Sequence, residues 1–168
     1  MNYAQMRKYD TANGPGIRST LFVSGCTHHC PGCFNQDFQK FNYGQKWTDD
    51  AADAFIDMIS DPQIKGITIL GGEPMDQVHD DDLLNLVRRI KKEIGKDLWI
   101  YSGYTFEQII AHEKRKKILS FCDVLVDGLF VEELKDLRLK FRGSSNQRIV
   151  DVRASLETGN VTLMTEFN

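Results

Sequence analysis

The sequence predicts an α/β protein whose mainly parallel sheet curves into a partial, laterally open (β/α) barrel. Short apolar runs alternate along the chain with segments of helical periodicity, an order typical of parallel sheets. A closed barrel of eight units takes about 250 residues, so room remains for about five or six units. The chain has 168 residues. This length favours one domain, residues 1–168, with a core of its own.

The first predicted strand covers residues 17–25, where aromatic and β-branched residues run up to a glycine. A loop over residues 24–44 follows and holds three of the four cysteines. Thr48 is expected to cap the next helix, because Asp49 and Asp50 place negative charge in its first turn. The core side of that helix is expected to consist of Ala51, Phe55, Met58 and Ile59.

The rest of the chain continues the alternation. Apolar runs predict further strands over residues 66–70, 98–101, 124–126 and 147–152. Further helices are predicted over residues 80–94, 105–117 and 131–139. Thr105 and Gln108 have the spacing of a capping box at the start of the second of these. Residues 153–168 have no clear periodicity and are expected to form a loosely packed tail.

Composition and charge exclude several classes of partner. The net charge of −3 gives no overall basic surface for nucleic acid. The first residues lack the build of a signal peptide, and no apolar run is long enough to span a membrane. Clustered cysteines in such a chain are typical of metal or redox sites in a reducing compartment. We therefore expect a cytoplasmic protein that binds neither nucleic acid nor a membrane.

The most informative local pattern is a group of cysteines with the spacing C-x3-C-x2-C. Cys26, Cys30 and Cys33 lie within eight residues, directly after the first predicted strand, and no fourth cysteine is near them. Three thiolates on one loop can bind three corners of an iron–sulfur cluster. The fourth corner then stays open for chemistry.

Two alternative interpretations of this loop remain open. His28 or His29 could supply the fourth ligand of a zinc-binding module, although the sequence has no second pair of ligands. Cys30 and Cys33 alone could serve a thiol–disulfide oxidoreductase, which leaves Cys26 without a role. If neither histidine is a ligand, both are expected to be exposed loop residues or hydrogen-bond donors around the site.

A glycine-rich turn follows the second predicted strand at Gly71, Gly72, Glu73 and Pro74. Ligands of parallel sheets bind at the carboxyl ends of the strands, and adjacent glycines allow a ligand close to the backbone. Ser102 and Asp127 end two later strands and are further candidates for the wall of a cofactor site, although Asp127 could equally cap a turn. Cys122 is expected to be a small buried apolar residue.

These motifs together resemble the radical S-adenosylmethionine enzymes. Residues 13–18, with the sequence Asn-Gly-Pro-Gly-Ile-Arg, are similar to the start of glycyl-radical-enzyme activases. Residues 99–104, 124–128 and 141–147 resemble one branch, the activating proteins of anaerobic (class III) ribonucleotide reductase. The resemblance runs from about residue 2 to residue 150. It implies that the partial barrel is of the radical S-adenosylmethionine type.

The resemblance implies a mechanism. Cys26, Cys30 and Cys33 would bind one [4Fe-4S] cluster, and S-adenosyl-L-methionine would chelate its fourth iron through amino and carboxylate groups. One electron from the cluster would cleave the sulfonium and give a 5′-deoxyadenosyl radical. That radical would take a hydrogen atom from a backbone glycine of anaerobic ribonucleoside-triphosphate reductase. The electron would come from a low-potential donor such as flavodoxin or ferredoxin.

The resemblance also implies residue roles. Gly71, Gly72 and Glu73 would hold the methionine amino group. Many members of the family have an aromatic residue directly before the third cysteine, where this chain has Gly32. We therefore expect Phe34, or the backbone beside it, to contact the adenine.

Two further residues and one alternative target complete what the resemblance implies. Arg142 and Asn146 would contact the partner protein or the S-adenosylmethionine carboxylate. The nearest alternative target is another glycyl radical enzyme of the pyruvate formate-lyase type.

Overall fold

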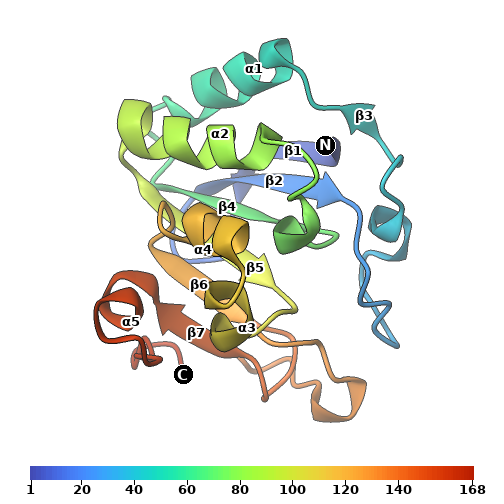
Figure 1. The fold of residues 1–168 in the computed structure, drawn as a ribbon, viewed down its shortest axis with the longest axis vertical. Coiled ribbons are helices and arrows are strands. Elements are labelled where there is room, and N and C mark those ends of the chain that lie inside the picture. Colours follow the sequence, from blue (N-terminus) through green and yellow to red (C-terminus); the bar gives the residue numbers. More distant parts are fainter.

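The computed structural model describes residues 1–168. They form one seven-stranded sheet with helices packed against it (Figure 1). The strands are β1 (Asn2–Asp10), β2 (Arg18–Ser24), β3 (Gln45–Lys46), β4 (Gly66–Gly71), β5 (Asp97–Ser102), β6 (Val124–Asp127) and β7 (Arg148–Asp151). The helices are α1 (Asp49–Ile59), α2 (Asp82–Arg89), α3 (Phe106–Ile110), α4 (Glu113–Leu119) and α5 (Val152–Thr158). No helix is both long enough and apolar enough to cross a bilayer.

The sheet has the order β3-β1-β2-β4-β5-β6-β7 and does not close on itself. Strands β2, β4, β5 and β6 are parallel neighbours. Strands β1 and β7 pair antiparallel with β2 and β6 on the two sides of that parallel unit. The prediction of an α/β protein with an open sheet is confirmed, but the sheet is mixed, because three of its strand pairings are parallel and three are antiparallel. A barrel of radical S-adenosylmethionine type stays a prediction.

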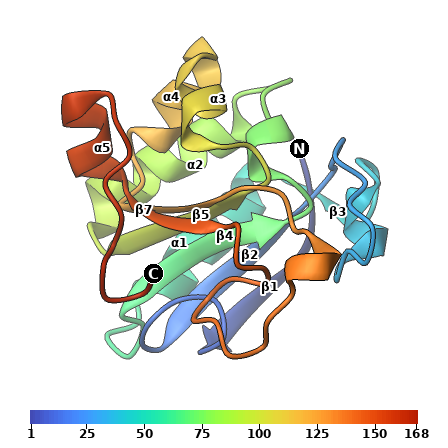
Figure 2. The same cartoon turned by 90° about the horizontal axis from the view of Figure 1, so that it is seen from below.

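The two faces of the sheet carry different residues. Leu98 and Ile100 of β5 join the main core, where α1, α2, α3 and α4 pack. Trp99 and Tyr101 point to the opposite face, as the two-residue period of a strand requires. Figure 2 shows α2, α3 and α4 together on one side of the sheet. The opposite face is therefore left free of helices and is available for a site.

Several predicted elements are confirmed. Strands β2, β4, β5, β6 and β7 overlap the five predicted apolar runs. Thr48 caps α1 by accepting a hydrogen bond from the Ala51 N–H, and Thr105 and Gln108 form the predicted capping box at α3. In α1 the buried positions include Ala52 and Ile56 in place of the predicted Ala51 and Met58, which pack at the edge of the core.

Two helix predictions are corrected. The segment 105–117 is not one helix, because the His112 side chain accepts the Arg115 N–H and starts α4 as a separate helix. The predicted helix over 131–139 is reduced to a 3-10 turn, Glu132–Leu134. The Asp136 carboxylate accepts a hydrogen bond from the Arg138 N–H, and this local bond competes with the backbone hydrogen bonds of a helix.

The remaining differences lie in segments with weak sequence patterns. Residues 80–94 form α2 followed by a π-helical turn, Ile90–Ile94, which ends at Gly95. Strand β1 was not predicted because it is largely polar and its pairing with β2 has two register shifts. Within residues 153–168 the chain forms most of α5, and Phe167 packs against Trp99 and Phe141.

A buried arginine holds the amino-terminal end of the parallel strands together. Arg18 is 2% exposed, and its guanidinium donates to the Thr68 hydroxyl, to the Asp97 carboxylate and to three backbone carbonyls. These bonds use all five N–H groups of the side chain. Arg18 also lies 5.4 Å from the centroid of the Trp99 ring.

Replacing Arg18 with methionine should lower the free energy of unfolding of the cofactor-free protein by about 3 kcal/mol. The reason is that each hydrogen bond to a charged group contributes about 1.5–3 kcal/mol, while the cost of desolvating the buried guanidinium offsets part of the summed loss. Arg18→Lys keeps the positive charge but lacks the planar guanidinium, so its free energy of unfolding should lie between those of wild type and Arg18→Met. Urea unfolding measures the loss, and a loss below about 1 kcal/mol would contradict this role.

Candidate cofactor site

A cavity of about 700 Å³ opens on the face of the sheet that carries no helices. Phe22, Leu70, Tyr101 and Val126 form its floor, one residue from each of the four parallel strands. The volume lies within the range of about 300–1,000 Å³ that is typical of ligand pockets. The cysteine loop and the turn after β4 form the wall at the carboxyl ends of β2 and β4.

All three clustered cysteines line this cavity. Cys26, Cys30 and Cys33 are each partly exposed and free. The loop is anchored at its start, where the Gly25 N–H donates to the Phe38 carbonyl at 2.7 Å and the Cys26 N–H to the Gln39 carbonyl at 3.0 Å. The fourth cysteine, Cys122, is 5% exposed within the core on the other face. The prediction that it is a buried apolar residue is confirmed.

The surroundings of Cys26 and Cys30 raise the pKa of both thiols. Burial raises the pKa of the Cys26 thiol to about 11, and the nearby carboxylates of Glu73 and Asp76 act in the same direction. Burial also raises the pKa of Cys30. A redox-active C-x-x-C pair needs a lowered thiol pKa. The raised pKa of Cys30 therefore argues against thiol–disulfide exchange by this loop.

The turn after β4 contacts the start of the cysteine loop directly. Gly71 has φ +118°, and a Cβ there would lie 2.5 Å from the Val23 carbonyl oxygen. A Cβ on Gly72 would lie 2.6 Å from the Phe38 carbonyl oxygen. The Gly72 N–H donates to Val23 and the Glu73 N–H to Gly25, both at 2.8 Å. Both glycines are thus required by close approach of backbone to backbone.

Glu73 is a buried carboxylate with four donors. It is 1% exposed. Its Oε1 accepts from the Met75 N–H at 2.9 Å and from the Ser102 hydroxyl at 2.7 Å. Its Oε2 accepts from the Gly103 N–H at 2.7 Å and lies 2.9 Å from Nε2 of His28. Glu73 therefore joins the ends of β4 and β5 to the cysteine loop.

His28 should make the stability of the cofactor-free protein depend on pH. The hydrogen bond to Glu73 raises the pKa of the imidazole. Because the folded pKa exceeds the unfolded value of about 6.5, the stabilisation is complete below about pH 6.5 and is lost as the pH rises through the folded pKa. Thermal unfolding from about pH 6 to about pH 9 should show this decline in wild type. An unchanged decline in His28→Gln would contradict it.

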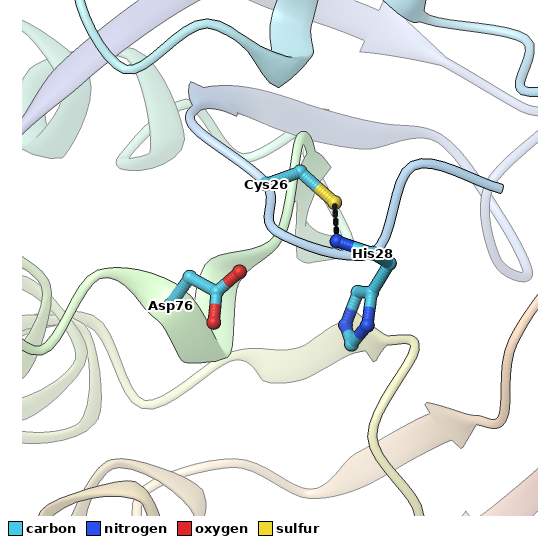
Figure 3. A group of neighbouring side chains, drawn as sticks. All are labelled: Cys26, His28 and Asp76. Carbon is cyan, nitrogen blue, oxygen red and sulfur yellow. Dashed lines mark hydrogen bonds between the residues drawn. The ribbon is translucent and has the colours of Figure 1, made fainter.

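The donor set fits an iron–sulfur cluster better than a single ion. One group of potential ligands gathers within 4.8 Å, and it consists of Cys26, His28 and Asp76 (Figure 3). A single ion there would leave Cys30 and Cys33 unused. All three cysteines line the cavity, and a cluster can use each of them because each cysteine binds a different iron.

A second loop, residues 128–147 between β6 and β7, crosses the cavity next to the cysteines and is called the crossing loop below. Phe34 is 63% exposed, and its ring centroid lies 5.0 Å from that of Phe130. A Cβ on Gly32 would lie 2.9 Å from the Glu132 carboxyl carbon. Figures 1 and 2 both show the turn near residue 132 beside the cysteine loop. Phe34 lines the cavity, whereas Gly32 faces the crossing loop.

The other candidates divide into those that line the cavity and those that do not. Ser102 and Arg142 line it, and Nε of Arg142 is buried without a hydrogen-bond partner. Asp127 instead accepts the Phe106 N–H at 2.6 Å and pairs with Arg148. The Asn146 side chain donates to the Leu129 carbonyl at 2.8 Å. Pro74 is buried at the start of the 3-10 turn Pro74–Asp76.

Sequence reasoning missed a polar group behind the cysteine loop, formed by Asp76, Tyr104 and Arg115. Tyr104 donates to Asp76 at 2.6 Å, and Arg115 lies over the Tyr104 ring at 4.0 Å. Asp76 could have been noticed, since it follows the glycine-rich turn by two residues. Nothing in the sequence links Arg115 to it.

Comparison with known proteins gives a consistent result. The family described as "4Fe-4S single cluster domain" matches residues 12–150. The chain is 44% identical over 156 residues to a protein of Escherichia coli K12, with 91% of this chain and all of that relative covered. It is 42% identical over 152 residues to a protein of Vibrio cholerae, with 89% of this chain and 97% of that relative covered.

A third relative comes from a virus. The protein of Enterobacteria phage T4 is 37% identical over 150 residues, with 89% of this chain and 93% of that relative covered. All three relatives carry the name anaerobic ribonucleoside-triphosphate reductase-activating protein.

Proposed function

The chain belongs to the family of anaerobic ribonucleoside-triphosphate reductase-activating proteins, and we propose that it installs a glycyl radical in such a reductase. It would do so with one [4Fe-4S] cluster and S-adenosylmethionine. The observation that carries the proposal is the cavity itself. It brings Cys26, Cys30 and Cys33 together with the turn from Gly71 to Glu73.

Cys26, Cys30 and Cys33 would hold the cluster. The cavity offers it three cysteines, and Cys122 is buried in the core on the other face of the sheet, so no fourth protein thiolate blocks the remaining iron. His28 points its Nε2 to Glu73 and is a hydrogen-bonding neighbour of the site rather than a free ligand. This arrangement agrees with a cluster whose open iron binds a small molecule.

When bound, the cluster and S-adenosylmethionine together supply a 5′-deoxyadenosyl radical that can take a hydrogen atom from a glycine. The chain's own residues would bind and orient these groups and shield the radical from water. Tyr101 and Val126 give the cavity an apolar floor, which excludes water from a reactive species. The wall beside the cysteines is fixed by backbone hydrogen bonds between Gly72 and Val23 and between Glu73 and Gly25.

S-adenosylmethionine would be held by both ends of this cavity. The backbone of Gly71 and Gly72 would approach the methionine amino group, while Glu73 fixes the turn through its four donors. Arg142 would bind the carboxylate, because its positively charged side chain lines the cavity. Phe34 would face the adenine. Ser102 acts through Glu73, and Asp127 and Asn146 would act only by holding α3 and the crossing loop.

The partner would be a glycine-bearing loop of the anaerobic reductase, reaching the cavity from the helix-free side of the open sheet. A low-potential donor such as flavodoxin or ferredoxin would supply the electron. The activase of another glycyl radical enzyme uses the same chemistry and is the alternative target. We place the protein in the cytoplasm, where its thiols stay reduced.

Anaerobic reconstitution tests the proposal. The loaded protein should be brown, should contain about four irons and four sulfides per chain, and should cleave S-adenosylmethionine to methionine and 5′-deoxyadenosine when reduced. Colourless protein that holds one zinc ion under the same conditions would refute it. Insulin-disulfide reduction without iron would favour the oxidoreductase instead.

A further inference from the structure

A buried carboxylate lies directly behind the first cysteine. Asp76 ends the turn after β4 and is 9% exposed. Its Oδ2 accepts two hydrogen bonds from Thr27, one from the backbone N–H and one from the hydroxyl, both at 2.9 Å. Thr27 directly follows Cys26, so this double contact fixes the backbone that carries the first cysteine.

The same carboxylate is close to the cysteine sulfur. The ligand atoms of Cys26, His28 and Asp76 all lie within 4.8 Å of one another. Figure 3 shows Asp76 coming from the turn after β4, while Cys26 and His28 come from the loop after β2. The negative charge of a second buried carboxylate, Glu73, contributes to the raised pKa of the same thiol. The cysteine that would bind iron is thus flanked by fixed negative charge.

The other oxygen of Asp76 faces a cation. Its Oδ1 accepts from the Tyr104 hydroxyl at 2.6 Å and lies 3.5 Å from Nη2 of Arg115. Arg115 is held in place by its Nε, which donates to the Met75 carbonyl at 2.8 Å, and by the face of the Tyr104 ring. Asp76 therefore stands between the cysteine loop and a partly buried guanidinium.

We propose that Asp76 is a positioning residue that fixes the Cys26 backbone and lowers the reduction potential of the bound cluster, with Arg115 offsetting part of this effect. The inference rests on the proposed function. Adding an electron beside a fixed negative charge is unfavourable, and a partly buried charge is weakly screened. Cluster potentials respond to nearby charge and to hydrogen bonds around the sulfurs.

Redox titration of the reconstituted protein, followed by electron paramagnetic resonance, tests the charge effect. Asp76→Asn keeps an oxygen for Thr27 but removes the charge. It should raise the ratio of reduced to oxidised cluster at a fixed potential at least tenfold, or about 59 mV for one electron. Arg115→Gln should shift the potential in the opposite direction. Asp53→Asn, on the exposed outer side of α1, should leave it unchanged.

An unchanged or lower potential in Asp76→Asn would overturn the charge effect. If that variant loads too little iron to titrate, Arg115→Gln decides, because it leaves both Thr27 contacts intact. A fall in its potential supports the proposal, and an unchanged or raised potential refutes it. Wild type that assembles no cluster at all would count against the proposed function, so the two failures are distinguishable.

Thr27→Val tests the positioning effect without a change of charge. It removes the hydroxyl bond to Asp76 and keeps the backbone bond. Iron release to a chelator should become several-fold faster, while the midpoint potential stays at the wild-type value. Unchanged release would refute the positioning role.

Discussion

Replacing Cys26, Cys30 or Cys33 with alanine, one at a time, is expected to abolish both stable cluster binding and reductive cleavage of S-adenosylmethionine. Each variant leaves two thiolates in the cavity, and no other cysteine can replace the third, because Cys122 is buried in the core on the opposite face of the sheet. Iron and sulfide analysis after anaerobic reconstitution measures the first loss. Chromatographic detection of 5′-deoxyadenosine measures the second.

Cys122→Ala is the matched control. It removes a sulfur atom from the core and should cost about 1 kcal/mol of stability while leaving iron content and cleavage intact. Retained cleavage in Cys26→Ala would contradict the three-cysteine site. It would favour a role for Cys30 and Cys33 alone.

The second large effect is expected for Gly71→Ala. A side chain at φ +118° is strained, at a cost of about 1–3 kcal/mol, and its Cβ would overlap the Val23 carbonyl oxygen. Val23 belongs to β2 and the chain reaches Cys26 three residues later, so the displacement would pass to the cysteine loop. Affinity for S-adenosylmethionine should fall at least tenfold, or about 1.4 kcal/mol. Isothermal titration with the loaded protein measures it.

Gly95→Ala separates backbone strain from the local overlap. Gly95 has φ +70°, and the nearest atom to an added Cβ lies 4.0 Å away. Gly95→Ala should lose stability through backbone strain alone and should keep the wild-type affinity for S-adenosylmethionine. If both variants bound S-adenosylmethionine as wild type does, the turn after β4 would not be part of the binding site.

The fold could be predicted where local sequence decides structure. Strands β4 and β6 are mostly buried and therefore appear as short, largely apolar runs. The caps of α1 and α3 are local as well, since Thr48 and Thr105 bond within their own first turns. By contrast, β1 gains its stability from pairing with β2, a contact between distant residues that its polar sequence does not reveal.

The candidate site likewise has a part that local sequence predicts and a part that depends on contacts between distant residues. The cysteines and the glycine-rich turn are contiguous motifs, and the cavity brings them together as their positions after β2 and β4 predict. The environment of Cys26 depends on Thr27, Asp76, Tyr104 and Arg115, which come from four separate segments. The ion pair between Asp127 and Arg148 also joins residues that are distant in sequence, so the sequence alone could not decide the role of Asp127.

The central claim is the transfer of a radical to a glycine of the reductase. The most direct measurement mixes the reduced, cluster-loaded protein with S-adenosylmethionine and anaerobic ribonucleoside-triphosphate reductase, and then records the electron paramagnetic resonance spectrum. The account predicts a glycyl radical on the reductase that does not form without S-adenosylmethionine or with Cys26→Ala. A loaded protein that cleaves S-adenosylmethionine yet leaves this reductase without a glycyl radical would contradict it.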